Sequence, residues 1–485
     1  MRRVLAELSE TLDKTYERIL SEIPKSSRVY AHRLLQCLTV AIRPLGVEEL
    51  GEVLAVDFTA IGGTPTLKED LRWEDQEQAV LSACSSLITV VKNLRSRVVQ
   101  FSHFSVKEFL TSDRLATSGM DTSRYHHIRL LDAHTTMAQA CLSVLLRLDH
   151  DIGMESVRKF PLADYAACHF GEHVEFEDVL SHIRCGVDDL LDGHKPHFAA
   201  WFWMRESPRW KIHPQEAPAA PLYYVTQVGY LGLAQYLISK HPEDLNNEGR
   251  AGTLLHAASL GGHIKIVELL LGHFVNVDVR NANNRTPLHL AAGQGFVEVA
   301  RKLVECNADI NTVDDSGQTP LYLSVAAGYE DGNLDVTGFL LDHGADVDAR
   351  DNEDSTLLHA ASSAGSVKTA ELLLKYGANI HGRNKKGRTP LLHAVATSDD
   401  GWAENYFDAI RLLLQHGADA DAQDNDHMTA LHLAGRIGCL KAAQLLLGFG
   451  ASVYLQNSEG KTALQVAWAE GDELFVELLS EDWQV

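Results

Sequence analysis

The stretch TPLHLAAGQGFVEVARKLVECNADINTVDDSGQ, residues 286–318, carries the pattern that decides the fold of more than half of this chain. Thr286 suits the position before a helix, and Pro287 suits the first helical turn. Gly293 or Gly295 then ends this short helix. A second helix follows with an apolar face, and the turn-rich residues NADINTVDDSGQ return as a hairpin to the next threonine. The stretch therefore predicts a helix–turn–helix–hairpin unit.

The opening Thr-Pro-Leu-His recurs with small changes through the second half of the chain, mostly at a spacing of 33 residues. Units begin at residues 220, 253, 286, 319, 356, 389, 429 and 462. This period and this tetrapeptide resemble the ankyrin repeat. Because one such unit cannot bury its apolar face alone, the resemblance implies about eight stacked units over residues 220–485.

The ankyrin resemblance also implies a structural role for the threonine and the histidine of the motif. In that family the threonine hydroxyl and the histidine ring hydrogen-bond and brace the start of the helix. The pairs that match here are Thr253 with His256, Thr286 with His289, Thr356 with His359, and Thr429 with His432. Other units have Tyr223, Tyr322, Leu392 or Gln465 in place of the histidine, so the brace is not carried over to them.

The net charge of −23 lies mainly in the repeats, because residues 220–485 hold 18 Lys and Arg against 35 Asp and Glu. Nucleic acids and anionic membranes bind positive surfaces, so neither is expected as a partner, whereas a basic protein would be attracted. No apolar run approaches the roughly 18 residues of a membrane span. Seven scattered cysteines without a C-x-x-C pair favour a reducing, cytoplasmic setting.

Residues 1–118 are patterned as a different domain. Helices are predicted at 8–24, 29–42, within 43–56, at 73–85 and at 105–112, and strands at 86–91 and 97–101. Helices followed by a two-stranded hairpin predict a winged helix. The expected recognition helix, 73–85, carries Glu74, Asp75 and Glu77 but no Lys or Arg, which disfavours DNA binding.

Three segments of this domain resemble the winged helix that follows the NACHT domain in fungal signal-transducing NTPases with ankyrin tails. They are TLDKTYERIL (11–20), LLQCLTVAIRPLGVEELGEVLAVDF (34–58) and VVQFSHFSVKEFLTS (98–112). The segment is also similar to the one named after GPI inositol-deacylases. Residues 125–215 resemble the helical spacer of the same NTPases. In that family NACHT binds ATP or GTP and the repeats sense a partner, but no complete Walker A motif transfers NTPase activity to this chain.

Two short stretches imitate ligand sites. GRNKKGRT, residues 382–389, differs from the phosphate loop G-x-x-x-x-G-K-[ST] by one arginine, but the repeat register puts it on a hairpin tip. HFGEH, residues 169–173, matches an inverted zinc-protease motif, but Gly171 weakens a helix there and the chain contains 24 histidines. No other catalytic constellation stands out, so we expect no enzyme activity, no cofactor and no metal.

The sequence thus predicts a mainly α protein: a winged helix at 1–118, a helical spacer at 119–219 and ankyrin repeats at 220–485. The predicted function is a non-enzymatic scaffold or sensor that binds a protein partner. The alternative is the C-terminal regulatory half of a NACHT-type NTPase switch, as a truncated gene product or a separate subunit.

Ankyrin stacks present their hairpin tips and inner helices as a concave face, so the predicted partner-binding residues lie on these parts of each unit. They are Asn283, Asn284, Gln294, Asp314, Asp315, Glu353, Asp354, Lys385, Lys386, Arg388, Trp402, Asp426, His427, Arg436 and Trp468. Trp402, beside Tyr406 and Phe407 in an insertion, either packs on the outer helix or anchors a partner.

Overall fold

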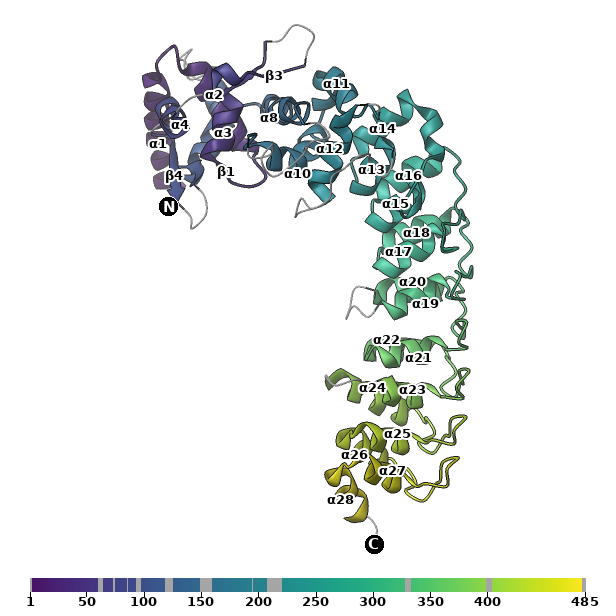
Figure 1. The fold of residues 1–485 in the computed structure, drawn as a ribbon. Helices are drawn as coiled ribbons and strands as arrows, with labels where there is room; N and C mark the ends of the chain where they lie inside the picture. Colours follow the sequence, from purple (N-terminus) through teal and green to yellow (C-terminus); the bar gives the residue numbers. More distant parts are fainter. Residues whose placement is uncertain are drawn as a thin grey trace. The chain divides into compact units, whose positions relative to one another are not determined.

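The computed structural model describes residues 2–59, 64–72, 75–84, 86–92, 97–117, 125–148, 159–193, 195–206, 220–327, 333–397 and 404–481. It is mainly helical, as predicted, and forms two compact units, Met1–Asn247 and Glu248–Val485 (Figure 1). The first helix pair with repeat-like sequence belongs to the first unit, while the domain limits at 118/119 and 219/220 stay predictions. No helix in the described part of the chain is both long and apolar enough to cross a membrane.

The first unit begins with a winged helix. Its helices are α1 (Arg2–Glu22), α2 (Arg28–Val40), α3 (Val47–Leu54), α4 (Gln76–Cys84), α5 (Phe104–Leu110) and α6 (Asp113–Ala116). Strands β4 (Ile88–Lys92) and β5 (Arg97–Phe101) form the expected antiparallel hairpin. The helix predicted at 8–24 is present as α1, which already begins at Arg2 and ends at Glu22.

The sheet also has a strand that the sequence did not predict. β1 (Leu45–Gly46) pairs with β5, giving the order β1-β5-β4. Two residues are too few to show the alternation by which a strand is recognised, so only the pairing reveals β1. A second short pair joins β2 (Val56–Asp57) to β3 (Thr66–Leu67), next to the 3₁₀ turn η1 (Glu69–Leu71).

The helical spacer packs around buried aromatic side chains. It contains α8 (Leu130–Leu145), α10 (Ala163–Val174), α11 (Val179–Leu190) and α12 (Pro196–Glu206), followed by α13 (Pro221–Val228), α14 (Leu231–Lys240) and η2 (Pro242–Asn246). Trp201 is fully buried, donates from Nε1 to the Ala167 carbonyl at 3.0 Å, and meets the Tyr224 ring edge-on at 5.3 Å. The Glu175 carboxylate accepts the Gly232 and Leu233 amides at the start of α14. These contacts explain why α13 and α14 belong to the first unit.

The second unit is a stack of helix pairs that follow a short β6 (Glu248–Gly249) and β7 (Gly252–Thr253) pair (Figure 1). The pairs are α15 (Leu254–Gly261) with α16 (Ile264–Gly272), α17 (Pro287–Gln294) with α18 (Val297–Glu305), α19 (Pro320–Ala326) with α20 (Leu334–Asp342), α21 (Leu357–Ser363) with α22 (Val367–Lys375), α23 (Pro390–Thr397) with α24 (Glu404–Gln415), α25 (Ala430–Ile437) with α26 (Leu440–Gly448), and α27 (Ala463–Glu470) with α28 (Glu473–Glu481). The first helix of each pair packs on the first helix of the next pair, and the second helices pack likewise.

The two long units carry their extra residues between their helices, as the sequence predicts, because α19 ends at Ala326 before Leu334 and α23 ends at Thr397 before Glu404. Residues 328–332 and 398–403 lie outside the described residues, and with them Trp402. Phe407 is buried on α24, which is the packing alternative for this aromatic residue.

Each described hairpin tip is closed by the side chain of an Asp or Asn, a role that the sequence analysis did not predict. Asp314 is one example: its Oδ1 accepts the amides of Ser316 at 2.8 Å and of Gln318 at 3.0 Å. The equivalent residues are Asn281, Asp351, Asn384, Asp424 and Asn457. Such Asx turns supply hydrogen-bond acceptors for the backbone amides of the tip.

Neighbouring tips are joined by main-chain hydrogen bonds. The Asp315 amide donates to the Asn283 carbonyl at 3.2 Å, and the Lys385 amide donates to the Glu353 carbonyl at 2.9 Å. The third residue after each Asx residue has a positive φ. Glycine occupies this place at 317, 387 and 460, whereas Asn284, Asp354 and His427 adopt it with a side chain.

We expect Gly387→Ala to destabilise the protein more than Gly344→Ala. Both glycines have a positive φ, 71° and 87°, where a Cβ costs about 1–2 kcal/mol. At 387 the new Cβ would also lie 2.9 Å from the backbone nitrogen of Asn425, whereas at 344 nothing lies within 4 Å. Free energies of unfolding from urea titrations followed by circular dichroism should differ by roughly 1 kcal/mol or more between the variants. If both variants lose the same free energy of unfolding, the close approach to Asn425 adds nothing to the cost of placing a Cβ at a positive φ.

Candidate partner-binding site

The motif histidines join each repeat to the next one. The Thr286 amide donates to Nδ1 of His289 at 3.1 Å, and the Thr286 hydroxyl lies 2.9 Å from the same nitrogen. Since Nδ1 accepts, the proton of the neutral ring is on Nε2, which donates to the Gln318 carbonyl at 3.0 Å. His256, His359 and His432 make the same set of contacts.

Units without this histidine use other groups at the same place. Tyr322 donates its hydroxyl to Oδ2 of Asp351 at 2.9 Å, which is again a residue 29 positions along the chain. Gln465 accepts the Thr462 amide with Oε1 at 3.0 Å. Leu392 has no polar group to offer, and the next residue, His393, packs edge-on against the His359 ring at 5.5 Å. The stack is therefore chemically distinct around Tyr322 and Leu392.

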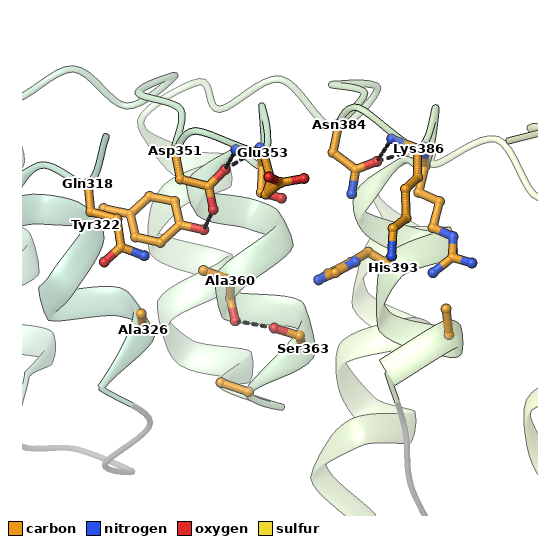
Figure 2. Close-up of a pocket in the computed structure, with 14 residues that line it drawn as sticks. Gln318, Tyr322, Ala326, Asp351, Glu353, Ala360, Ser363, Asn384, Lys386 and His393 are labelled. Atoms are coloured by element: carbon orange, nitrogen blue, oxygen red, sulfur yellow. Dashed lines mark hydrogen bonds between the residues drawn. The ribbon is translucent and has the colours of Figure 1, made fainter. Parts of the chain in front are cut away.

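A hollow of about 700 Å³ opens at this part of the stack, on the inner helices α19, α21 and α23. Its lining residues are Gln318, Tyr322, Ala326, Asp351, Glu353, Ser355, Ala360, Ser363, Ala364, Asn384, Lys386, Arg388, His393 and Ala396. Figure 2 shows Tyr322, Asp351 and Glu353 on one side of it and Lys386 and His393 on the other. We call this hollow the inner pocket.

Small side chains create the inner pocket. In the repeat register, Ala360 occupies the place that Leu290, Leu323 and Leu433 hold in other units. Ser363 and Ala364 continue the floor on the same helix. Alanine also stands at the equivalent position 257, so the small side chain at 360 leaves space in the pocket that a leucine would partly fill, without being its only cause.

The rim of the inner pocket carries opposite charges on opposite sides. Asp351 is held by the amides of Glu353 and Ser355 and by the Tyr322 hydroxyl. Glu353 and Lys386 are exposed, and neither side chain makes a hydrogen bond or an ion pair with another described residue.

His393 lies between these rims. Burial lowers the pKa of His393, and the nearby charges of Arg388 and Lys386 add to this effect. The ring is therefore neutral at neutral pH, so the lysine and the arginine supply the positive charge of this side. Arg388 is less available than Lys386, since its Nε donates to Asp424 at 3.4 Å and its side chain is only 17% exposed.

Most of the predicted partner-binding residues are exposed where the structure describes them. On the tips these are Asn283, Asn284, Asp315, Glu353, Asp354, Lys385, Lys386, Asp426 and His427, and on the inner helices Gln294, Arg436 and Trp468. The inner pocket brings together three of the predicted residues, Glu353, Lys386 and Arg388. Tyr322, Asp351, His393 and Ala360 were missed as lining residues, although the departures from the repeat motif at 322 and 392 were a usable signal.

Asp314 differs from the other predicted residues, because it is buried. Its side chain is 2% exposed; besides closing its own turn it accepts Nε of Arg285 at 3.0 Å. Asp424 holds Arg388 in the equivalent way. Asp314 therefore supports the tip rather than offering a charge to a partner, and we leave it out of the proposed contact surface.

The phosphate-loop look-alike has its amides already in use. Within GRNKKGRT, Asn384 accepts the amides of Lys386 and Arg388 with Oδ1 and the amide of Gly387 with its carbonyl. The Lys385 amide donates to Glu353 of the preceding tip. A phosphate loop needs these N–H groups to face the ligand, so the stretch is a repeat hairpin.

The zinc-motif look-alike is part of a packed helix. His173 is buried, with Nδ1 2.9 Å from His134 Nδ1 and Nε2 2.9 Å from the Tyr165 hydroxyl. Burial lowers the pKa of His173 to about 3. Gly171 gives the Tyr230 ring room to pack against α10. No group of three or more His, Cys, Asp or Glu side chains able to hold a metal occurs among the described residues.

The recurring helix pairs and the threonine–histidine contacts agree with comparisons to known families. Residues 222–314, 273–351, 323–424 and 400–484 match the family described as Ankyrin repeats (3 copies), which together is more than half of the chain. The chain belongs to the ankyrin-repeat family. Ankyrin repeats indicate a protein–protein interaction module. Residues 17–120 match the family described as GPI inositol-deacylase, winged helix domain, so the predicted winged helix is confirmed.

Similar curated proteins come from fungi and animals. Azaphilone pigments biosynthesis cluster protein L of Monascus ruber is 28% identical over 297 residues, which is 56% of this chain and 61% of that protein. Human Ankyrin repeat and SOCS box protein 16 is 30% identical over 268 residues, 55% of this chain and 51% of the relative. This ankyrin-repeat chain thus spans about half to three fifths of the length of these relatives.

A solved structure is also similar over the repeats. The crystal structure of the human ASB11 ankyrin repeat domain is 28% identical, with a TM-score of 0.41, over 46% of this chain and 96% of that domain.

The motif histidines should make the protein sensitive to acid. Burial lowers the pKa of His289 and of His359 from 6.5 to about 4. Between these values the unfolded chain binds protons that the folded repeats exclude, so this stability is complete above about pH 6.5 and falls as the pH falls toward 4. The double variant His289→Gln and His359→Gln copies Gln465. Over this pH window we expect its free energy of unfolding to fall by roughly 1–3 kcal/mol less per replaced histidine than that of the wild type.

Urea unfolding of both proteins at about pH 7 and about pH 4.5 measures this difference. The exposed His381→Gln variant is the matched control and should follow the wild-type profile. If the double variant loses as much stability as the wild type, the buried neutral rings are not the source of the acid sensitivity.

Proposed function

We propose that this chain is a non-enzymatic scaffold or sensor whose ankyrin repeats bind a protein partner in the cytoplasm. The observation that supports it is the row of exposed, mostly acidic tips beside the inner pocket on the same repeats. The tip backbones are satisfied by Asx turns and by neighbouring tips, so the exposed side chains remain for contacts with a partner. Ankyrin-repeat relatives and the protein-interaction role of the fold support the same proposal.

The partner that this surface favours is basic. Asp315, Asp354 and Asp426 are exposed on three different tips, and Lys385 and Lys386 interrupt the row on one tip only. Such charges at the rim of an interface mainly raise the association rate and select against acidic partners. The same charge balance is the reason that we propose no nucleic-acid or membrane binding.

Neutralising the tips should weaken partner capture. The bait is the full chain, used on an extract of the cells that produce it, and the variant combines Asp315→Asn, Asp354→Asn and Asp426→Asn. Since rim charges contribute a few tenths to 1 kcal/mol each, captured partners should bind roughly tenfold more weakly and depend less on salt. Quantitative mass spectrometry of the bound proteins at several salt concentrations measures this effect.

The matched control removes the same charge from the outer helices, with Glu298→Gln, Glu305→Gln and Glu371→Gln, and should capture partners like the wild type. Equal weakening in both variants would mean that only net charge matters. If the wild type captures no partner, the proposed function is wrong.

We propose as a second candidate the C-terminal regulatory half of a NACHT-type NTPase switch, which rests on the sequence resemblance of residues 11–20, 34–58 and 98–112 alone. In this case the repeats would sense the partner and the NTPase would lie in another part of the gene product or in another subunit. Sequencing of the transcript around the Met1 codon tests it. An upstream reading frame with G-x-x-x-x-G-K-[ST] would favour this candidate, and an upstream stop codon would contradict the truncated form.

A further inference from the structure

The inner pocket has features that the general tip surface lacks, and they define the chemistry of an occupant. One rim offers the free carboxylate of Glu353 beside Asp351, and the other offers the free ammonium of Lys386 beside Arg388. Glu353 and Lys386 lie on neighbouring tips joined by the hydrogen bond from Lys385 to Glu353, yet their own side chains do not pair within 4.0 Å. Each charge is thus left for a group outside the described residues.

The walls below the rim fit an extended peptide better than a compact ion. The Tyr322 ring is held in place by its hydrogen bond to Asp351. The floor consists of Ala360, Ser363 and Ala364, whose side chains are small and uncharged. The Ser363 hydroxyl donates to the Ala360 carbonyl at 3.0 Å, so the floor presents no charged group to an occupant. The volume of about 700 Å³ lies within the range of sites that take ligands much larger than an ion.

We propose that the inner pocket binds an extended segment of a partner protein that carries one basic and one acidic side chain close together. The basic side chain pairs with Glu353 and lies over Tyr322, while the acidic side chain pairs with Lys386. This inference rests on the proposed function, since it names the chemistry of the segment that the repeats recognise. It also explains why a basic tip stands in an acidic row: Lys386 supplies the second half of a two-charge recognition site.

A peptide library tests the proposal with the full chain. The library consists of Gly, Ser and Ala peptides that carry Arg with Glu, two Arg, or two Glu at separations from adjacent to several residues. We expect the wild type to retain Arg-with-Glu peptides roughly tenfold more strongly than either like-charged set, because like charges meet repulsion at one rim. A preference for two Arg would show simple acidic attraction and would overturn the inference.

Single charge reversals should change this preference in opposite directions. Glu353→Lys leaves a free ammonium on each rim, with Asp351 held by its own hydrogen bonds, so peptides with two Glu should gain most. Lys386→Glu makes both rims acidic, so peptides with two Arg should bind best. The control variant reverses an exposed pair on the outer helix α22, with Glu371→Lys and Lys375→Glu, and should keep the wild-type preference. Unchanged preference in both rim variants contradicts the proposal.

Filling the pocket gives an independent test that leaves every charge in place. Ala360→Leu introduces the side chain found at the equivalent positions 290, 323 and 433, so the stack has room for it in other units. We expect at least tenfold weaker retention of Arg-with-Glu peptides, with a thermal midpoint near that of the wild type. Full retention by a folded Ala360→Leu protein would place the peptide elsewhere and overturn the inference.

The outcomes separate this inference from the proposed function. If partner capture by the wild type depends on the tips but not on Ala360, Glu353 or Lys386, the repeats bind a partner and the inner pocket is not its site. If no peptide and no protein binds, both proposals fail together.

Discussion

The neutral histidine of each Thr-x-x-His motif is the interaction on which the repeat stack depends. Its Nδ1 accepts from the threonine at the start of its own helix, and its Nε2 donates to a carbonyl at the next hairpin, as in His289 with Gln318. One buried ring therefore defines both a helix start and the distance to the neighbouring unit. A protonated ring would lose the acceptor, so the stack also requires these histidines to stay neutral.

The tips complete this frame and leave the surface free for recognition. Each Asx turn satisfies its own amides, and main-chain bonds such as Lys385 to Glu353 tie one tip to the next. With the backbone satisfied, tip side chains can vary without loss of the fold. The inner pocket lies where the histidine is replaced by Tyr322 and Leu392 and where an alanine at 360 replaces a leucine, so variation of the motif and opening of a binding space coincide.

Sequence reasoning was strongest where local rules repeat and weakest where a contact joins distant residues. The helix starts at Thr286 and its equivalents, the turn glycines and the winged-helix hairpin follow from residue type and spacing. β1 was not predictable, because two residues gain strand character only by pairing with Val98 and Val99. Asp314 looked like a free tip charge, but its carboxylate is buried against Arg285. Identical residue types thus separate into supporting and exposed groups only once their neighbours are known.

The sequence by itself determined the repeat, its period, the acidic balance of the stack and the absence of a complete phosphate loop, since these depend on residue identity and spacing along the chain. Only the tertiary structure decided which residues share the inner pocket, because Tyr322 and Glu353 lie at opposite ends of one unit and Lys386 belongs to the next. It also decided that the helix pair at 221–240 belongs to the first unit, through Trp201 and Glu175. Both outcomes depend on packing between segments, which local periodicity does not encode.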